Sequence, residues 1–136
     1  MLNSRTISFS IARPVEVVYE FLLEPTNFAK WAFVGDVAMQ YLSGRDWSVE
    51  TSVGPRIIRF ADRNAFGVLD HFTLRYKDDL PHPFGMRVVA NGEGSELIYT
   101  YFQRRDVSDA EWTSTLEWIM ADLLALKSLL ESGEAR

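Results

Sequence analysis

The 136-residue sequence contains no cysteine and only two histidines, His71 and His82. Without cysteine the chain can form no disulfide, no thiolate metal site and no cysteine nucleophile. The His-x-His and His-Glu-x-x-His spacings of metal sites are also absent. Loops that bind nucleotide phosphates are missing too, because no third glycine follows Gly92 and Gly94 to open a helix. We therefore predict no metal ion and no cofactor.

Positive charge and long hydrophobic runs are also scarce. The chain has 14 Lys and Arg against 19 Asp and Glu, a net charge of −5. Affinity for a nucleic-acid backbone comes from neutralising phosphates, so this balance argues against a nucleic-acid partner. No apolar run approaches the roughly 20 residues that cross a bilayer, and residues 1–5 lack the basic start of a signal peptide. We expect a cytoplasmic protein without a membrane span.

What the chain does contain is typical of a globular protein. Hydrophobic residues make up 47% and aromatic residues 13% of the chain, and its length suits a single domain over 1–136. The aromatic content is sufficient for a large core or for a cavity lined with rings. Composition alone does not distinguish between the two.

The N-terminal third predicts one strand followed by two short helices. Residues 6–13 alternate between apolar and small or polar side chains, which is typical of a half-buried strand. Pro14 suits a first helical position, and residues 15–23 have helical spacing. Pro25 stops that helix, and Thr26 could cap a second one that ends at Trp31.

The middle of the chain reads as antiparallel hairpins. Segments rich in β-branched and aromatic residues are separated by short turn signals such as Ser43-Gly44 and Asn91-Gly92. Consecutive strands joined by short turns pair antiparallel. The predicted strands are 36–42, 46–52, 56–63, 65–76, 85–90 and 95–104.

The last element is a long amphipathic helix. Ser108 and Glu111 form a capping box at its start, and Gly133 is a plausible terminator. Its apolar residues recur at steps of three and four, which predicts one continuous stripe. That stripe comprises Trp112, Leu116, Ile119, Leu123, Leu126 and Leu130. The fold class is therefore α+β, with a curved antiparallel sheet wrapped around the long C-terminal helix and two short helices after the first strand.

This order of elements resembles the START-like superfamily, also called Bet v 1-like, SRPBCC or helix-grip. Residues 11–18 at the first strand–helix junction and Trp31 after the second helix carry the resemblance. Segments 64–71, 86–96 and 122–131 look like short bacterial proteins of the polyketide cyclase/dehydrase-like group. The resemblance implies a cavity between sheet and helix that holds a lipid, a sterol, a polyketide or another apolar molecule.

Three polar residues are candidates for chemistry. Asp70 and His71 are adjacent in a predicted strand, so their side chains point to opposite faces and only one can face a cavity. His71 could transfer a proton or bind a ligand, and Arg87 could hold an anionic group bidentately. The alternative is structural: a buried histidine, and an Asp70–Arg87 ion pair on the convex side. The residues favour the structural alternative.

Large apolar and tyrosine side chains are the candidates for contact with a ligand. Most residues of this kind must form plain core in a chain of this size. Tyrosines could also orient a ligand through their hydroxyl groups. The candidates are Trp31, Phe33, Trp47, Phe60, Phe72, Met86, Tyr99, Tyr101, Trp112, Leu116 and Met120.

Three functions fit this sequence. The first is binding of a small hydrophobic molecule, which needs only a cavity with a few polar anchors. The second is a cyclase or dehydratase acting on an aromatic polyketide-like substrate, which needs an acid–base group within reach. The third is a protein-interaction domain without an internal ligand. The residues favour binding over catalysis, and an exposed edge strand or the wide apolar face of the last helix favours a homodimer.

Overall fold

The computed structural model describes residues 1–32, 38–51, 54–75 and 81–133. Within these ranges, seven antiparallel strands form one sheet in the order β1-β7-β6-β5-β4-β3-β2. The strands are β1 (Ser4–Ile11), β2 (Met39–Ser43), β3 (Asp46–Thr51), β4 (Gly54–Arg59), β5 (His71–Leu74), β6 (His82–Asn91) and β7 (Gly94–Phe102). The helices are α1 (Val15–Leu23), the 3₁₀ helix η1 (Pro25–Lys30) and α2 (Asp109–Glu131).

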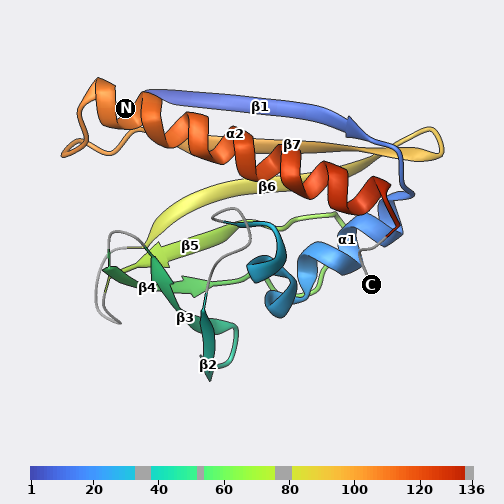
Figure 1. Ribbon diagram of the computed structural model, residues 1–136, viewed down its shortest axis with the longest axis horizontal. Coiled ribbons are helices and arrows are strands. Elements are labelled where there is room, and N and C mark those ends of the chain that lie inside the picture. The colour runs from blue at the N-terminus through green and yellow to red at the C-terminus, as the bar shows by residue number, and fades with distance from the viewer. Residues whose placement is uncertain (33–37, 52–53, 76–80, 134–136) are drawn as a thin grey trace.

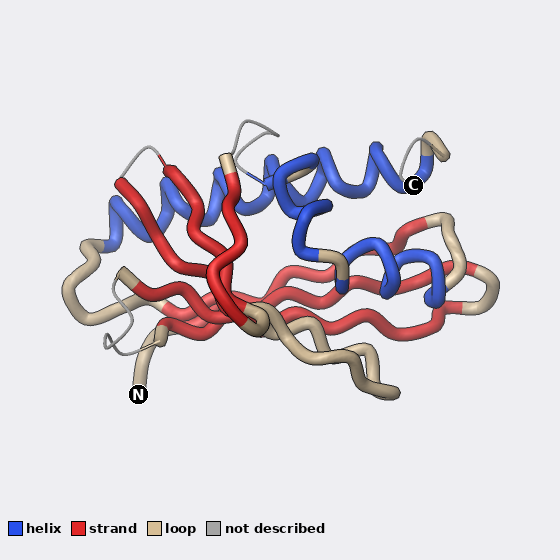
Figure 2. The backbone as a smooth tube through the Cα atoms, turned by 90° about the horizontal axis from the view of Figure 1, so that it is seen from below, coloured by secondary structure: helices blue, strands red, loops and turns tan. Residues whose placement is uncertain are grey.

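The helices lie on one side of the sheet (Figure 1). Figure 2 shows the strands curving toward this side, with α2 lying across the sheet and the shorter helices at one end. The sheet buries one face against the helices, so buried and half-buried residues alternate along β7. The predicted α+β helix-grip arrangement is confirmed.

The N-terminal helices follow the two prolines. Pro14 stands immediately before α1 with an extended backbone, one position earlier than predicted. At η1 the predicted cap, Thr26, is wrong. The carboxylate of Glu24 accepts hydrogen bonds from the Thr26 amide at 3.3 Å and from its hydroxyl at 3.0 Å. Pro25 occupies the first helical position. Glu24 is therefore the residue before the helix, and its side chain reaches forward to the free amide of Thr26.

Helix α2 starts and ends where its sequence predicts. The Ser108 hydroxyl accepts a hydrogen bond from the Glu111 amide at 3.2 Å, which satisfies one of the free N–H groups at the helix start. Gly133 has a φ of +76° just beyond the end, a conformation that favours glycine. Only the second half of the stripe is fully buried, at Leu123, Leu126 and Leu130.

Hydrogen bonds attach the C-terminal end of α2 to the junction between β1 and α1. The Ala12 amide donates to the Glu131 carboxylate at 2.7 Å. The Arg13 guanidinium donates to the Leu130 carbonyl at 2.9 Å, one of the helix-end carbonyls without an intrahelical partner. The C-terminal end of α2 is therefore fastened to the β1–α1 junction.

The predicted strand 65–76 is wrong over its first half. Asn64 makes this segment a loop, because its side-chain oxygen accepts hydrogen bonds at 3.0 Å from the amides of Phe66 and Val68. Such side-chain bonds compete with strand pairing. Only an isolated bridge at Val68 and the short strand β5 remain. The predicted starts and ends at 36 and 76 lie outside the described residues. No helix in the described ranges is long and apolar enough to cross a membrane.

Candidate functional site

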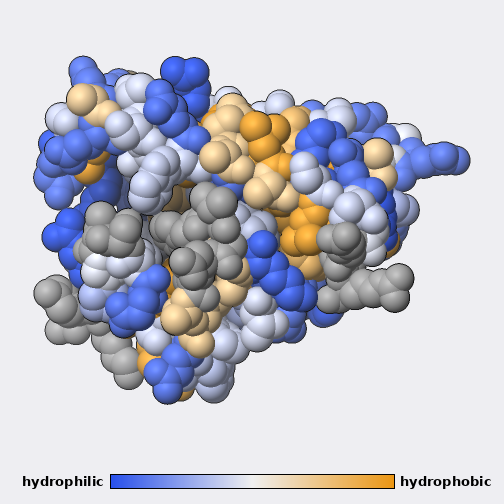
Figure 3. Space-filling view, in the orientation of Figure 1, coloured by the Kyte–Doolittle hydropathy of each residue, from blue (hydrophilic) through white to orange (hydrophobic). Residues whose placement is uncertain are grey.

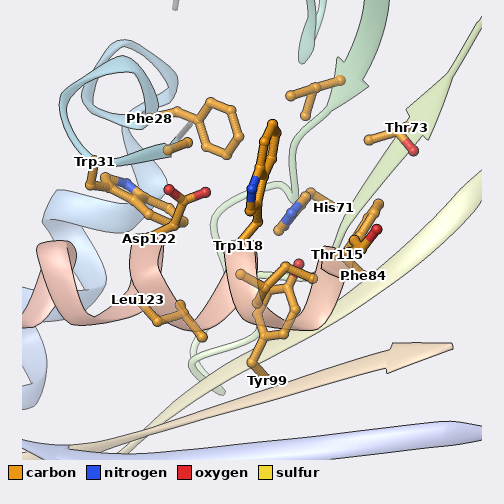
Figure 4. A pocket seen from close by; sticks show the side chains of 13 residues that line it. Phe28, Trp31, His71, Thr73, Phe84, Tyr99, Thr115, Trp118, Asp122 and Leu123 are labelled. Carbon is orange, nitrogen blue, oxygen red and sulfur yellow. The ribbon is translucent and has the colours of Figure 1, made fainter. Parts of the chain in front are cut away.

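A cavity of about 150 Å³ lies between α2 and the concave face of the sheet. Six segments of the chain contribute to it, and its surface is predominantly aromatic and aliphatic (Figure 4). The lining residues are Phe28, Trp31, Ala32, Ile58, His71, Thr73, Phe84, Tyr99, Thr115, Trp118, Ile119, Asp122 and Leu123.

Aromatic rings hold one another in place around this cavity. The rings of Phe28 and Trp31 meet edge to face with centroids 5.3 Å apart, as their spacing of three positions predicts. The His71 imidazole stacks on Phe84 at 5.3 Å and 8°, and Phe84 stacks in turn on Tyr101 at 5.3 Å. Rings in such contact favour fixed orientations, so this wall of the cavity is preorganised.

His71 faces the cavity from β5 and is buried. Burial lowers the pKa of its imidazole to about 4, because the charged form loses solvation. The ring is therefore neutral at pH 7. Its Nδ1 lies 3.3 Å from the Leu69 carbonyl oxygen, which can only accept a hydrogen bond. In this tautomer Nδ1 carries the proton and Nε2 is an acceptor.

Tyr99 places a hydroxyl group in the same cavity from β7. Burial raises the pKa of Tyr99 well above its ordinary value, and the charges of Tyr101 and Asp122 raise it further. The phenol therefore stays protonated and can donate a hydrogen bond. Within the described residues, neither this hydroxyl nor Nε2 of His71 has a hydrogen-bond partner. These two atoms can thus offer a donor and an acceptor to a molecule in the cavity.

Helix α2 closes the cavity with side chains spaced by three and four residues. Thr115, Trp118 and Asp122 extend from α2 into the cavity in Figure 4, as expected for positions that share one helical face. Ile119 lines the same cavity. Trp118 nevertheless remains 58% exposed, so its indole lies between the cavity and the solvent. The surface around the middle of α2 is hydrophobic (Figure 3).

The structure brings together three of the residues predicted for a site. His71, Trp31 and Tyr99 line the cavity, and His71 is the member of the Asp70–His71 pair that faces inward. Phe33 was also predicted to bind ligand but lies outside the described residues.

Asp70 and Arg87 lie on the other face of the sheet and form the ion pair that the sequence favoured over a role in the cavity. The Arg87 guanidinium donates two hydrogen bonds to the Asp70 carboxylate, at 3.0 and 2.9 Å. The Met86 amide donates a third at 2.9 Å. The hydrogen bond from Arg87 lowers the pKa of Asp70. The physical reason is strand alternation: a neighbour of the inward His71 must point outward.

The remaining predicted ligand contacts lie outside the cavity lining, for three reasons. Phe72 alternates with His71 and lines a groove on the outer face. Trp47 packs edge to face on Tyr41 at 5.4 Å, and Met120 lies on the exposed side of α2. The others fill the surrounding core or stand behind the lining side chains, namely Phe60, Met86, Tyr101, Trp112 and Leu116.

Several lining residues were missed by the sequence reasoning. Phe28, Phe84 and Trp118 are aromatic residues that the pattern could not separate from core. Asp122 carried a usable signal. It follows Trp118 by four positions and Ile119 by three, so it places a charged residue type beside large apolar residues on one face of the helix. Which residues face Asp122 across the cavity depends on the curvature of the sheet, which the sequence pattern does not give. In the described part of the chain no group of three or more His, Asp or Glu could hold a metal ion.

Neither a protein-family model nor a curated protein matches this sequence. Solved structures do match. The Aha1 dimer from Colwellia psychrerythraea superposes with a TM-score of 0.71 at 14% identity, covering 96% of this chain and 97% of that chain. Ara h 8.0201 gives a TM-score of 0.72 at 9% identity, covering 97% of this chain and 99% of that one. The chain has the Bet v 1-like fold.

A third protein with this Bet v 1-like fold is DynU16, from the dynemicin biosynthetic locus. It matches with a TM-score of 0.71 at 16% identity, over 96% of this chain and 48% of that one. The predicted START-like architecture is therefore confirmed as a fold. At identities of this size a Bet v 1-like fold says nothing about the molecule bound, and membership of the polyketide cyclase/dehydrase-like group stays a prediction.

Proposed function

We propose that this protein binds a small hydrophobic molecule in the cavity beneath α2. The carrying observation is a ring-lined space of about 150 Å³ that includes two polar groups without a hydrogen-bond partner among the described residues. Pockets for small molecules combine an apolar surface with a few placed polar atoms. The Tyr99 hydroxyl as donor and Nε2 of His71 as acceptor would orient the bound molecule.

The size of the cavity limits the ligand to about one ring. Engineered protein cavities of about 150 Å³ bind benzene, whereas drug-sized ligands occupy pockets of about 300–1,000 Å³. A sterol, a long lipid or a multi-ring polyketide would require the cavity to widen, for example by displacement of the Trp118 indole. The proposal is therefore narrower than the ligand classes that the sequence implied.

Catalysis by a cyclase or dehydratase has weaker support. Arg87, the candidate for stabilising an anion, lies on the opposite face and is paired with Asp70. A general base works best when its pKa is near the operating pH, and burial lowers the pKa of His71 to about 4. His71 is thus better suited to accept a hydrogen bond than to remove a proton.

One observation favours protein interaction as a second function. Met120 and Leu124 are exposed on the outer side of α2, and exposed apolar areas often mark interfaces. Pairing of two copies through this face remains a prediction. It is compatible with ligand binding, because the cavity lies on the inner side of the same helix.

Thermal unfolding with ligands of increasing size tests the proposal. A neutral single-ring compound such as benzyl alcohol, at 100 times its dissociation constant, should add about 2.7 kcal/mol to the free energy of unfolding. For a chain of this length that is an increase of roughly 8–10 °C in Tm. A two-ring or steroid compound should give a smaller increase.

A filled cavity provides the control. Ala32→Leu adds a branched side chain at a lining position and should abolish the increase in Tm. Ala121→Leu makes the same substitution at an exposed position of α2 and should leave it unchanged. The proposal fails if benzyl alcohol gives no increase in the wild type, or if Ala32→Leu retains the full increase.

A further inference from the structure

Two polar atoms of the cavity lining have no hydrogen-bond partner among the described residues, namely Nε2 of His71 and the hydroxyl oxygen of Tyr99. His71 is 7% and Tyr99 5% exposed, so protein covers nearly all of each side chain. In the described part of the chain, the polar side-chain atoms that are fully buried without a partner are two others, Nε2 of His82 and Nε1 of Trp112. The two cavity atoms therefore keep a small accessible area, and this area faces the space that they line.

The surrounding structure fixes what each of these atoms can do. Burial keeps the His71 imidazole neutral at pH 7, and its Nδ1 lies 3.3 Å from the Leu69 carbonyl oxygen, so Nε2 is an acceptor. Burial also keeps the Tyr99 phenol protonated, so its hydroxyl can donate. A molecule in the cavity thus meets one uncharged acceptor and one uncharged donor.

The two rings that carry these atoms are neighbours. The centroids of His71 and Tyr99 are 6.3 Å apart, and Phe84 of the strand between them lies 5.3 Å from the first ring and 6.2 Å from the second. A space of about 150 Å³ holds about one ring, which leaves room for little more than one polar substituent. A hydroxyl group is small enough and can both donate and accept a hydrogen bond.

We infer that the preferred ligand is a neutral single-ring compound with one hydroxyl group, a phenol or an aryl alcohol, whose hydroxyl donates to Nε2 of His71 and accepts from Tyr99. This inference rests on the proposed function and specifies its ligand class. A ligand without a donor leaves Nε2 covered and unpaired, which weakens binding. Sites built to hydrogen-bond a hydroxyl group reject analogues that lack it for this reason.

Two isomers, ortho-cresol and anisole, test the inference by isothermal titration calorimetry. Both are neutral, contain one benzene ring and one oxygen, and have similar outlines, but only ortho-cresol can donate a hydrogen bond. The wild-type protein should bind ortho-cresol at least about tenfold more tightly than anisole. A tenfold ratio corresponds to about 1.4 kcal/mol, which lies within the cost of leaving a buried acceptor unsatisfied.

Two variants assign the two hydrogen bonds. His71→Phe removes the acceptor and keeps a ring to stack on Phe84, so ortho-cresol and anisole should bind within about twofold of each other. Tyr99→Phe removes the donor to either oxygen, so both compounds should bind more weakly and the preference for ortho-cresol should remain. As a control, His82→Phe replaces the other buried histidine, which is not part of the cavity lining, and should keep the wild-type preference.

The results separate the two proposals. If the wild type binds anisole as tightly as ortho-cresol, the preference for a hydroxyl group is overturned while the proposed binding function stands. If neither compound binds, both proposals fail. If His71→Phe retains the tenfold preference, Nε2 of His71 is not the acceptor and the inference is wrong. The wild-type comparison is decisive even if a variant does not fold.

Discussion

Lowering the pH from 7 to 5 should destabilise this protein because of His71. In the folded protein, burial lowers the pKa of this imidazole from 6.5 to about 4. In the unfolded chain the ring is solvated and its pKa is the ordinary one, about 6.5. Between these two values the unfolded state binds more protons than the folded state. Stability therefore decreases as the pH falls through 6.5 and levels off below about 4.

The magnitude follows from the difference between the two pKa values. One unit corresponds to 1.36 kcal/mol, so the full effect of His71 is about 3 kcal/mol, of which about 2 kcal/mol is lost between pH 7 and pH 5. Few carboxylates titrate in this window. His82 is also buried with a lowered pKa and acts in the same direction, so the contribution of His71 must be isolated by substitution.

Urea unfolding at pH 7 and pH 5 measures both free energies by linear extrapolation. His71→Phe keeps a ring in place to stack on Phe84 but removes the titrating group. The variant should lose about 2 kcal/mol less than the wild type between the two pH values. An equal loss in both proteins would mean that His71 is solvated in the folded state, and it would refute the neutral acceptor on which its role in the cavity depends.

Two further substitutions test the packing that surrounds the site. Leu126→Ala removes a fully buried side chain from α2 and should lower the free energy of unfolding, measured with a chemical denaturant, by about 3 kcal/mol. Leu124→Ala, at a residue 52% exposed, should lower it by well under 1 kcal/mol. Similar losses in both variants would mean that α2 buries a different face. Gly67→Ala would place a Cβ 2.1 Å from the Val88 carbonyl oxygen at a φ of +69° and should cost about 3 kcal/mol. Gly92 has a similar φ but open space around its Cβ position, so Gly92→Ala should lower the free energy of unfolding by only about 1 kcal/mol. Equal losses in the two variants would show that the close approach of Gly67 to β6 is unimportant.

Local sequence signals predicted most of the elements. Residues 15–23 form α1, as their spacing predicts, because prolines at 14 and 25 restrict both ends. Ser108 and Gly133 mark α2 equally well. The prediction of strand for 65–70 was wrong because hydropathy does not register the hydrogen bonds that Asn64 makes with neighbouring amides.

The site was less predictable because it depends on contacts between distant segments. Strand alternation showed that only one of Asp70 and His71 could face inward, but the choice depends on which face curves toward α2. Phe28 and Phe84 belong to the cavity because η1 and β6 approach the same turns of α2. The spacing of apolar residues within η1 or within β6 does not show that the two segments meet at α2.

The pairing of β1 with β7 has a consequence for how the chain folds. β1 stands at one end of the strand order, and the hydroxyls of Thr6 and Thr100 meet at 3.0 Å although they are 94 positions apart. At a synthesis rate of about 5–20 residues per second, β1 would leave the ribosome on the order of 5–20 s before its partner strand. The β6–β7 hairpin is local and can form first, because closing a long loop costs entropy before its contacts compensate. Until then β1 is an unpaired strand, so the first strand made is among the last to be incorporated.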